Sequence, residues 1–235
     1  MLFRSIKSNF KFFDFHIKER GIEKVDGILA DLGVSSYQID NKKRGFSYIG
    51  DNNLDMRMSS DNELTAEIVL NSYDQDKLQK VLYDYGDISN SKLIAKHIIE
   101  YRKKKSIKKN SDLFDSLKNI FSKNLSYKFL SKFFQAIRIE VNDEINSLKE
   151  MLIKSVNYLN ISGRLVIISY HSIEDRLVKN FINKSSFESD FNKNLYGQKI
   201  EFFKSLTKKP IIPSNEEKKI NPRSRSAKLR IGEKI

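Results

Sequence analysis

The sequence has 235 residues and contains no cysteine, only 3 prolines and 9 glycines, and no long apolar run. Without cysteine, disulfides, thiolate metal sites and cysteine nucleophiles are excluded. No apolar stretch approaches the roughly 20 residues that a membrane-spanning helix needs. The segment up to Phe15 is too charged for a secretory signal. We therefore expect a cytoplasmic protein without disulfides and without a membrane partner.

Several catalytic signatures are also absent. No glycine-rich phosphate loop or dinucleotide-binding loop occurs, and no serine-hydrolase elbow occurs. His171 and Ser172 are sequence neighbours, which rarely face each other as base and nucleophile. The 3 histidines are scattered at no metal-ligand spacing. Phosphoanhydride, serine-hydrolase and metal chemistry are therefore not predicted.

The composition describes a globular protein with an excess of positive charge. Hydrophobic residues make up 39% of the chain, enough for a real core. There are 43 Lys and Arg against 30 Asp and Glu, a formal net charge of +13. This excess favours polyanionic partners, because each neutralised phosphate releases bound counterions. Lysine enrichment through AT-rich coding is the alternative, and charge alone does not choose between RNA, DNA and membrane.

Apolar patterns predict strands on both sides of a helical block. Val25 to Gly33 and Arg164 to Tyr170 are short apolar runs typical of buried parallel strands. Helical spacing dominates between Leu64 and Ile120. We predict an α/β protein with an inserted helical subdomain. The further expected elements are a weak strand at Leu2 to Ser8, one long helix at Phe133 to Leu159 stopped by Asn160 to Gly163, a helix at Glu174 to Asn183, and short strands at Glu201 to Leu206 and Ser226 to Ile231.

The carboxyl ends of the two clear strands carry polar residues. Asp31 follows the first strand, and His171 and Ser172 follow the second. Open α/β sheets bind ligands beyond these ends, so both positions are candidate site residues. Two other interpretations stay open: Asp31 as a turn or cap residue, and His171 as a core histidine bonded to the backbone.

At these residues the chain resembles the RsmH/MraW methyltransferases, which methylate the N4 of a cytidine in small-subunit ribosomal RNA with S-adenosylmethionine. The resemblance implies a Rossmann-like class I methyltransferase sheet. It also implies domain boundaries: 1–45 with the third and fourth strands, 46–132 as the helical insertion, and 133–235 as the remainder. The matching stretches are DGILADLGVSSYQID (26–40), RGFS (44–47), LDMRM (54–58), FQAIRIEVN (134–142), GRLVIISYHSIEDR (163–176) and NPRSRSAKLR (221–230).

The resemblance assigns roles to individual residues. Phe10, Asp31 and Gln38 correspond to positions that contact S-adenosylmethionine, and no metal is needed. Asp31 is expected to orient the donor or the amino group, and His171 and Ser172 to contact the flipped base or take its proton. Basic side chains are expected to meet RNA phosphates; they are Arg57, Arg138, Arg176, Arg223 and Arg225. The run from Arg102 to Lys105 fits a solvated helix end nearly as well.

Family members begin with two further strands and a glycine-rich loop, which would precede Met1. We therefore expect these 235 residues alone to bind the methyl donor weakly, with the missing piece supplied by upstream sequence. The alternative function is a catalytically inactive remnant that binds RNA or the ribosome.

Overall fold

The computed structural model describes residues 4–121 and 125–235. Its chain forms two compact units. The first, here the sheet unit, combines the described residues up to Gly33 with Ile145–Ile235. The second, here the helical unit, is Val34–Glu144. This division places the FQAIRIEVN stretch in the helical unit, whereas the predicted boundaries assigned it to the sheet-bearing part.

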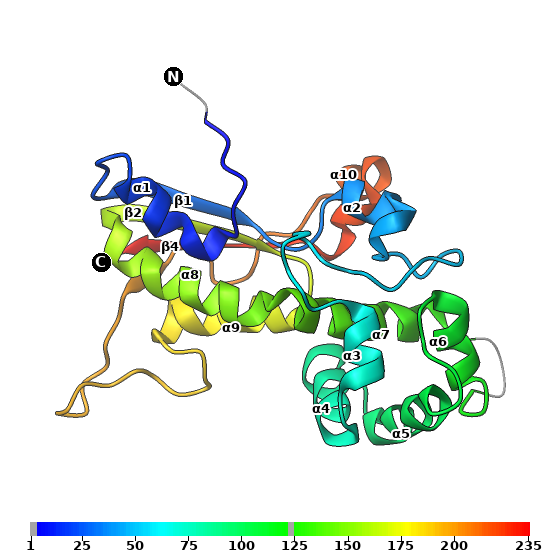
Figure 1. The fold of residues 1–235 in the computed structure, drawn as a ribbon. Coiled ribbons are helices and arrows are strands. Elements are labelled where there is room, and N and C mark those ends of the chain that lie inside the picture. Colours follow the sequence, from blue (N-terminus) through cyan, green and yellow to red (C-terminus); the bar gives the residue numbers. More distant parts are fainter. Residues whose placement is uncertain (1–3, 122–124) are drawn as a thin grey trace. The chain divides into compact units, whose positions relative to one another are not determined.

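The sheet unit contains four strands, and Figure 1 shows helices α8 and α9 running along them. The strand order is β1-β2-β4-β3. β1 pairs in parallel with β2, and β4 pairs antiparallel with both β2 and β3. The elements are η1 (Phe10–Phe12), α1 (Phe13–Lys18), β1 (Val25–Asp31), α8 (Glu144–Tyr158), β2 (Leu159–Ser169), α9 (Ser172–Lys184), β3 (Phe203–Ser205), α10 (Asn215–Ile220), η3 (Pro222–Ser226) and β4 (Lys228–Lys234).

The four strands overlap positions where strands were predicted, and the α/β class is confirmed. The predicted burial of the Val25 to Gly33 strand is wrong: β1 lies at an edge of the sheet, none of its residues is buried, and Leu29 is 68% exposed. β2 differs in one respect, because it begins at Leu159 and includes the stretch that was expected to be a turn. There Ser162 has a φ of 65°, and the pairing with β1 shifts register. A Cβ on Gly163 would lie 2.8 Å from the carbonyl oxygen of Asn160. The stretch Asn160 to Gly163 is therefore a bulge inside the strand, where glycine permits the close approach.

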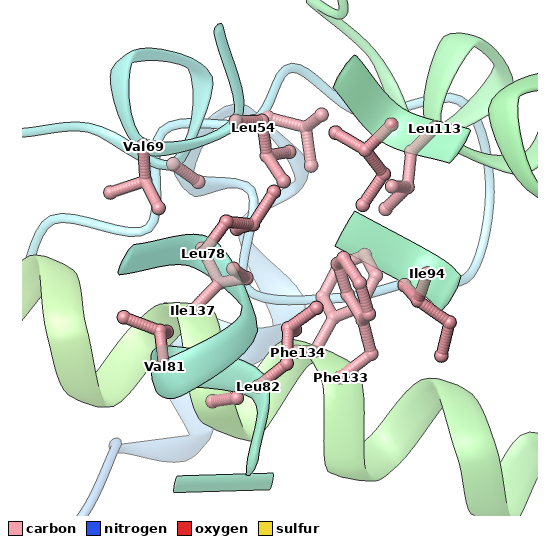
Figure 2. Packing of buried hydrophobic residues seen from close by; sticks show 14 of the residues in the cluster. Leu54, Val69, Leu78, Val81, Leu82, Ile94, Leu113, Phe133, Phe134 and Ile137 are labelled. Carbon is pink, nitrogen blue, oxygen red and sulfur yellow. The ribbon is translucent and has the colours of Figure 1, made fainter. Parts of the chain in front are cut away.

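The helical unit has its own hydrophobic core. Figure 2 shows this core, in which Leu78 and Leu82 of α4 lie near Phe133 and Ile137 of α7. Thr65, Asp74 and Ser126 cap the amino ends of α3, α4 and α7. The elements are α2 (Ser36–Asp40), η2 (Lys42–Arg44), α3 (Ala66–Ser72), α4 (Gln75–Gly86), α5 (Ser91–Arg102), α6 (Asn110–Leu117) and α7 (Tyr127–Asn142).

The prediction of one long helix from Phe133 to Leu159 is wrong. α7 ends at Asn142 and α8 begins at Glu144, and Asp143 between them adopts a left-handed conformation with a φ of 50°. The apolar spacing continues on both sides of this break because each helix buries its own apolar face, in a different compact unit. Periodicity therefore could not locate the break.

Two smaller expectations concern the amino end and membranes. Residues 4–8 form no strand, and Leu2 and Phe3 of the expected Leu2–Ser8 strand lie outside the described residues. In the described part of the chain, no helix is long and apolar enough to cross a bilayer.

Candidate active site

Polar residues follow β1 and β2 at the same edge of the sheet. The two strands run parallel, and Asp31 at the end of β1 pairs with Ile168, one residue before the end of β2. The segments that follow both strands therefore begin at neighbouring positions. This is the edge at which open α/β sheets bind their ligands.

Asp31 and Tyr170 connect the two strand ends. The Tyr170 hydroxyl donates a hydrogen bond to Oδ1 of Asp31 at 2.9 Å. Burial raises the pKa of Tyr170 to about 12, and the bond to the Asp31 carboxylate adds to that increase. Nearby, Gly33 has a φ of 87°, and a Cβ there would meet the Tyr170 ring at 3.6 Å. The phenol thus stays protonated at neutral pH and holds an exposed carboxylate in one orientation.

His171 and Glu174 hold the segment that follows β2. The His171 Nδ1 accepts a hydrogen bond from the Glu174 backbone N–H at 3.4 Å, which caps the start of α9. Its Nε2 lies 3.2 Å from a carboxylate oxygen of the buried Glu174. The other Glu174 oxygen accepts from the Tyr170 backbone N–H at 3.0 Å. One ring nitrogen of His171 is therefore bonded to the backbone, and its role at the site stays a prediction. Ser172 is the exposed first residue of α9.

An ion-pair cluster ties α9 to β4. One Asp175 carboxylate oxygen accepts from Nε of Arg230 at 2.7 Å, and the other accepts from the Lys228 ammonium at 3.2 Å. Asp175 and Arg230 are both buried. Burial alone would raise the pKa of Asp175, but the hydrogen bonds from Arg230 and Lys228 outweigh it and hold this pKa below its usual value. Two of the sequence motifs, ending at Arg176 and Arg230, meet through this cluster.

The other predicted donor-contacting residues lie on separate short elements. Phe10 begins η1 and is 40% exposed. This element is held by the Lys154 ammonium of α8, which donates to the Lys11 carbonyl and to Asp14 at 2.9 Å. In the helical unit, Gln38 forms a reciprocal capping box with Ser35 at the start of α2.

Three motif segments interlock inside the helical unit. The Asn142 side chain accepts from the Met58 backbone N–H at 2.6 Å and donates to the Met56 carbonyl at 2.8 Å. The Arg44 guanidinium donates to the carbonyls of Arg57 and Met58 at 2.6 and 2.9 Å. Met56 is fully buried and has a φ of 60°. The RGFS, LDMRM and FQAIRIEVN stretches therefore form one hydrogen-bonded cluster.

Two of the arginines predicted to bind RNA have partners within the helical unit. The Arg57 guanidinium makes a bidentate pair with Asp55 at 3.0 and 2.8 Å and also donates to two backbone carbonyls. Arg138 makes a bidentate pair with Glu144 at 2.8 and 3.0 Å. Both arginines therefore form ion pairs inside the helical unit, and their roles as phosphate contacts stay predictions. The remaining predicted arginines, Arg176, Arg223 and Arg225, are exposed in the sheet unit.

Tyr170 and Glu174 were predicted to lie among the polar residues directly after the second strand, but neither was assigned a role. Their position directly after the strand could have marked them as site residues, because side chains at a strand's carboxyl end are close to the ligand-binding edge.

Comparison with known proteins identifies the family. Residues 2–235 match the MraW methylase family. The chain belongs to this family. It is 49% identical to a ribosomal RNA small subunit methyltransferase H of Flavobacterium psychrophilum, with 99% of this chain and 79% of that protein covered. Proteins of the same name from Flavobacterium johnsoniae and Karelsulcia muelleri are both 47% identical, with 99% of this chain and 77% of each relative covered.

Membership of the MraW methylase family agrees with the architecture. The mixed four-stranded sheet with its helices is consistent with a class I methyltransferase fold. The match extends over both units, so the helical unit belongs to the family's architecture as much as the sheet does.

Proposed function

We propose that this protein transfers a methyl group from S-adenosylmethionine to the exocyclic N4 of a cytidine in small-subunit ribosomal RNA. The observation that supports this most strongly is the family match over residues 2–235. Relatives named ribosomal RNA small subunit methyltransferase H, 47–49% identical over nearly the whole chain, support the same substrate. The net charge of +13 suits a polyanionic partner in the cytoplasm. No observation favours an inactive remnant.

The residues at the β1 end fit the chemistry of the proposed donor. Bound S-adenosylmethionine supplies an electrophilic methyl group on a positively charged sulfonium. The exposed Asp31 carboxylate is the kind of group that attracts such a cation, and Gly33, with a φ of 87°, turns the chain directly after it. The exposed Phe10 ring offers an apolar surface for adenine. Gln38 is proposed as a further donor contact on the strength of the family motif.

Asp31 is the residue to which we assign the direct chemical role. The amino nitrogen of cytosine shares its lone pair with the ring, so it must be oriented before it can attack a methyl carbon. A carboxylate can accept a hydrogen bond from this amino group and take the proton that leaves as the new C–N bond forms. The Tyr170 hydroxyl fixes one Asp31 oxygen, so the carboxylate is preorganised for that task.

We assign His171 a supporting role. Both of its ring nitrogens lie close to Glu174 groups, which makes the imidazole suited to fixing the β2 end rather than to moving a proton. Ser172, exposed beside it, is proposed to contact the target base.

The product identifies the reaction. The protein, expressed together with whatever coding sequence precedes Met1 in its gene, is incubated with isotope-labelled S-adenosylmethionine and small ribosomal subunits from cells that lack this modification. Digestion of the RNA to nucleosides should then give labelled N4-methylcytidine. Label in a different nucleoside would contradict the assigned atom, and label in ribosomal protein would contradict the substrate class.

A further inference from the structure

A cavity of about 390 Å³ lies within the helical unit. Residues from the last turns of α5 and the turn after it line one side, and residues at the end of α6 line the other. Its volume falls in the range of roughly 300–1,000 Å³ that is typical of small-ligand pockets. None of these residues belongs to the proposed methyl-transfer site.

The carboxylates of the cavity already have cationic partners. Glu100 is 3.8 Å from the ammonium of Lys96, and Asp115 is 2.5 Å from that of Lys118. Each carboxylate therefore has a lysine close by, on α5 for Glu100 and just after α6 for Asp115, which weakens its repulsion of an anion. They remain available as hydrogen-bond acceptors without making the cavity repel an anion.

Two lysines at the rim carry uncompensated charge. Lys103 and Lys104 are exposed and line the cavity. No ion pair involves either of them in the described parts of the chain, whereas the next residue, Lys105, pairs with Asp112 at 2.6 Å. An anionic ligand group thus meets two free ammonium groups here, which is how lysines contact phosphates.

Aromatic rings and neutral polar groups line the rest of the cavity. His97 and Tyr101 are four residues apart on α5, so they lie on one face of the helix. Ser116, whose hydroxyl donates to the Leu113 carbonyl, and Asn119 also line the cavity, from the end of α6 and the residues that follow. Proteins hold unpaired RNA bases in this way, by stacking on aromatic rings and hydrogen bonding to the base edges.

We propose that this cavity binds one unpaired nucleotide of the ribosomal RNA substrate. The base stacks against His97 and Tyr101 and hydrogen-bonds with Asn119, and its flanking phosphates lie at Lys103 and Lys104. This inference rests on the proposed function, because it takes the substrate to be RNA. It assigns the helical unit a substrate contact remote in sequence from Asp31.

The first test compares variants of the full chain in binding a single-stranded fragment of small-subunit ribosomal RNA. Tyr101→Ala should weaken binding about tenfold, whereas Tyr101→Phe keeps the stacking ring and should bind normally. Tyr101 packs partly against the core, so thermal melting checks that the alanine variant folds. Replacing Lys103 and Lys104 with alanine, both exposed, should lower the salt slope of binding by about two. Lys92→Ala, an exposed lysine near the other end of α5, should leave the binding of the base unchanged.

The second test locates the RNA directly. Photo-crosslinking with thiouridine-substituted RNA should label peptides that contain Tyr101 or Asn119. Labels confined to other segments would overturn the proposal. The proposal would also be overturned if free cytidine monophosphate bound as tightly as the RNA, because that result indicates a mononucleotide site.

The two proposals fail in distinguishable ways. If the wild-type chain methylates small subunits but every cavity variant binds RNA normally, the cavity proposal is wrong and the proposed function stands. If the wild-type protein, expressed with the coding sequence that precedes Met1 in its gene, forms no N4-methylcytidine, the proposed function fails, whatever the cavity variants show.

Discussion

Asp175→Asn is expected to destabilise the sheet unit, because it removes the charge that two cations share. Oδ1 of Asp175 accepts from buried Arg230 at 2.7 Å, and Oδ2 accepts from half-exposed Lys228 at 3.2 Å. Breaking a buried ion pair by removing one partner costs about 3–5 kcal/mol, since the other charge stays buried without compensation. The more exposed Lys228 adds little. An amide oxygen can still accept from Arg230, so we expect about 3 kcal/mol, a large part of an ordinary domain stability of roughly 5–15 kcal/mol.

The pH dependence of this loss has a definite sign. The folded state holds the pKa of Asp175 below its usual value, so the ionised carboxylate stabilises the fold above the unfolded pKa of about 4. That contribution disappears as the pH falls through the lower, folded pKa. The stability difference between the wild type and Asp175→Asn should therefore be full near pH 7 and shrink in acid.

The loss of stability is measured by urea unfolding. Hydrogen exchange in peptides that cover α9 and β4 monitors the unfolding, so the measurement reports on the sheet unit alone. Asp190→Asn, the same change at an exposed position of this unit, is the matched control and should leave the midpoint in place. The reasoning is refuted if Asp175→Asn unfolds at the wild-type urea concentration near neutral pH, or if its deficit stays constant down to acid pH.

Two further predictions concern single residues. Tyr170 should ionise near pH 12, because burial and the Asp31 carboxylate both raise its pKa; the stability that this raised pKa provides is present below about pH 10 and is lost as the pH rises toward 12. The test compares ultraviolet titrations of the wild type and Tyr170→Phe, whose difference is the titration of Tyr170. If that difference shows an ordinary phenol pKa of about 10, the bond to Asp31 is contradicted. Gly45→Ala should destabilise the helical unit by more than about 2 kcal/mol, because φ is 71° and the new Cβ would lie 2.2 Å from the Asn53 carbonyl oxygen. Gly21→Ala, with a φ of 68° and nothing within 4 Å, should cost only about 1 kcal/mol in thermal or urea unfolding, and equal losses for the two variants would disprove the clash.

The main elements of the fold could be predicted from apolar patterns, but their breaks could not. β1 and the second half of β2 are apolar runs, and such runs indicate strands. They did not reveal that β1 is an edge strand with no buried residue. The bulge at Ser162 and the helix break at Asp143 depend on left-handed backbone conformations. Those conformations are set by tertiary packing, which local propensity does not contain.

The position of the candidate site was predictable, and its internal bonds were not. Asp31 could be chosen because it ends an apolar strand. The bond from Tyr170 to Asp31 joins residues far apart in sequence, and it exists because β1 and β2 pair in parallel. The Arg57–Asp55 pair could have been predicted from the sequence, because only one residue separates the two.

The most direct measurement of the central claim compares two aspartates of β1 in methyl transfer to undermethylated small ribosomal subunits, with the protein expressed together with the coding sequence that precedes Met1 in its gene. Asp31 ends the strand at the proposed site, whereas Asp26, near its start, accepts a hydrogen bond from Asn160. Asp31→Ala should lower the rate of methyl incorporation by roughly a hundredfold or more, the usual effect of removing one preorganised polar group. Asp26→Ala should remain close to the wild-type rate. Near-normal turnover by Asp31→Ala would contradict the placement of the active site at this edge of the sheet.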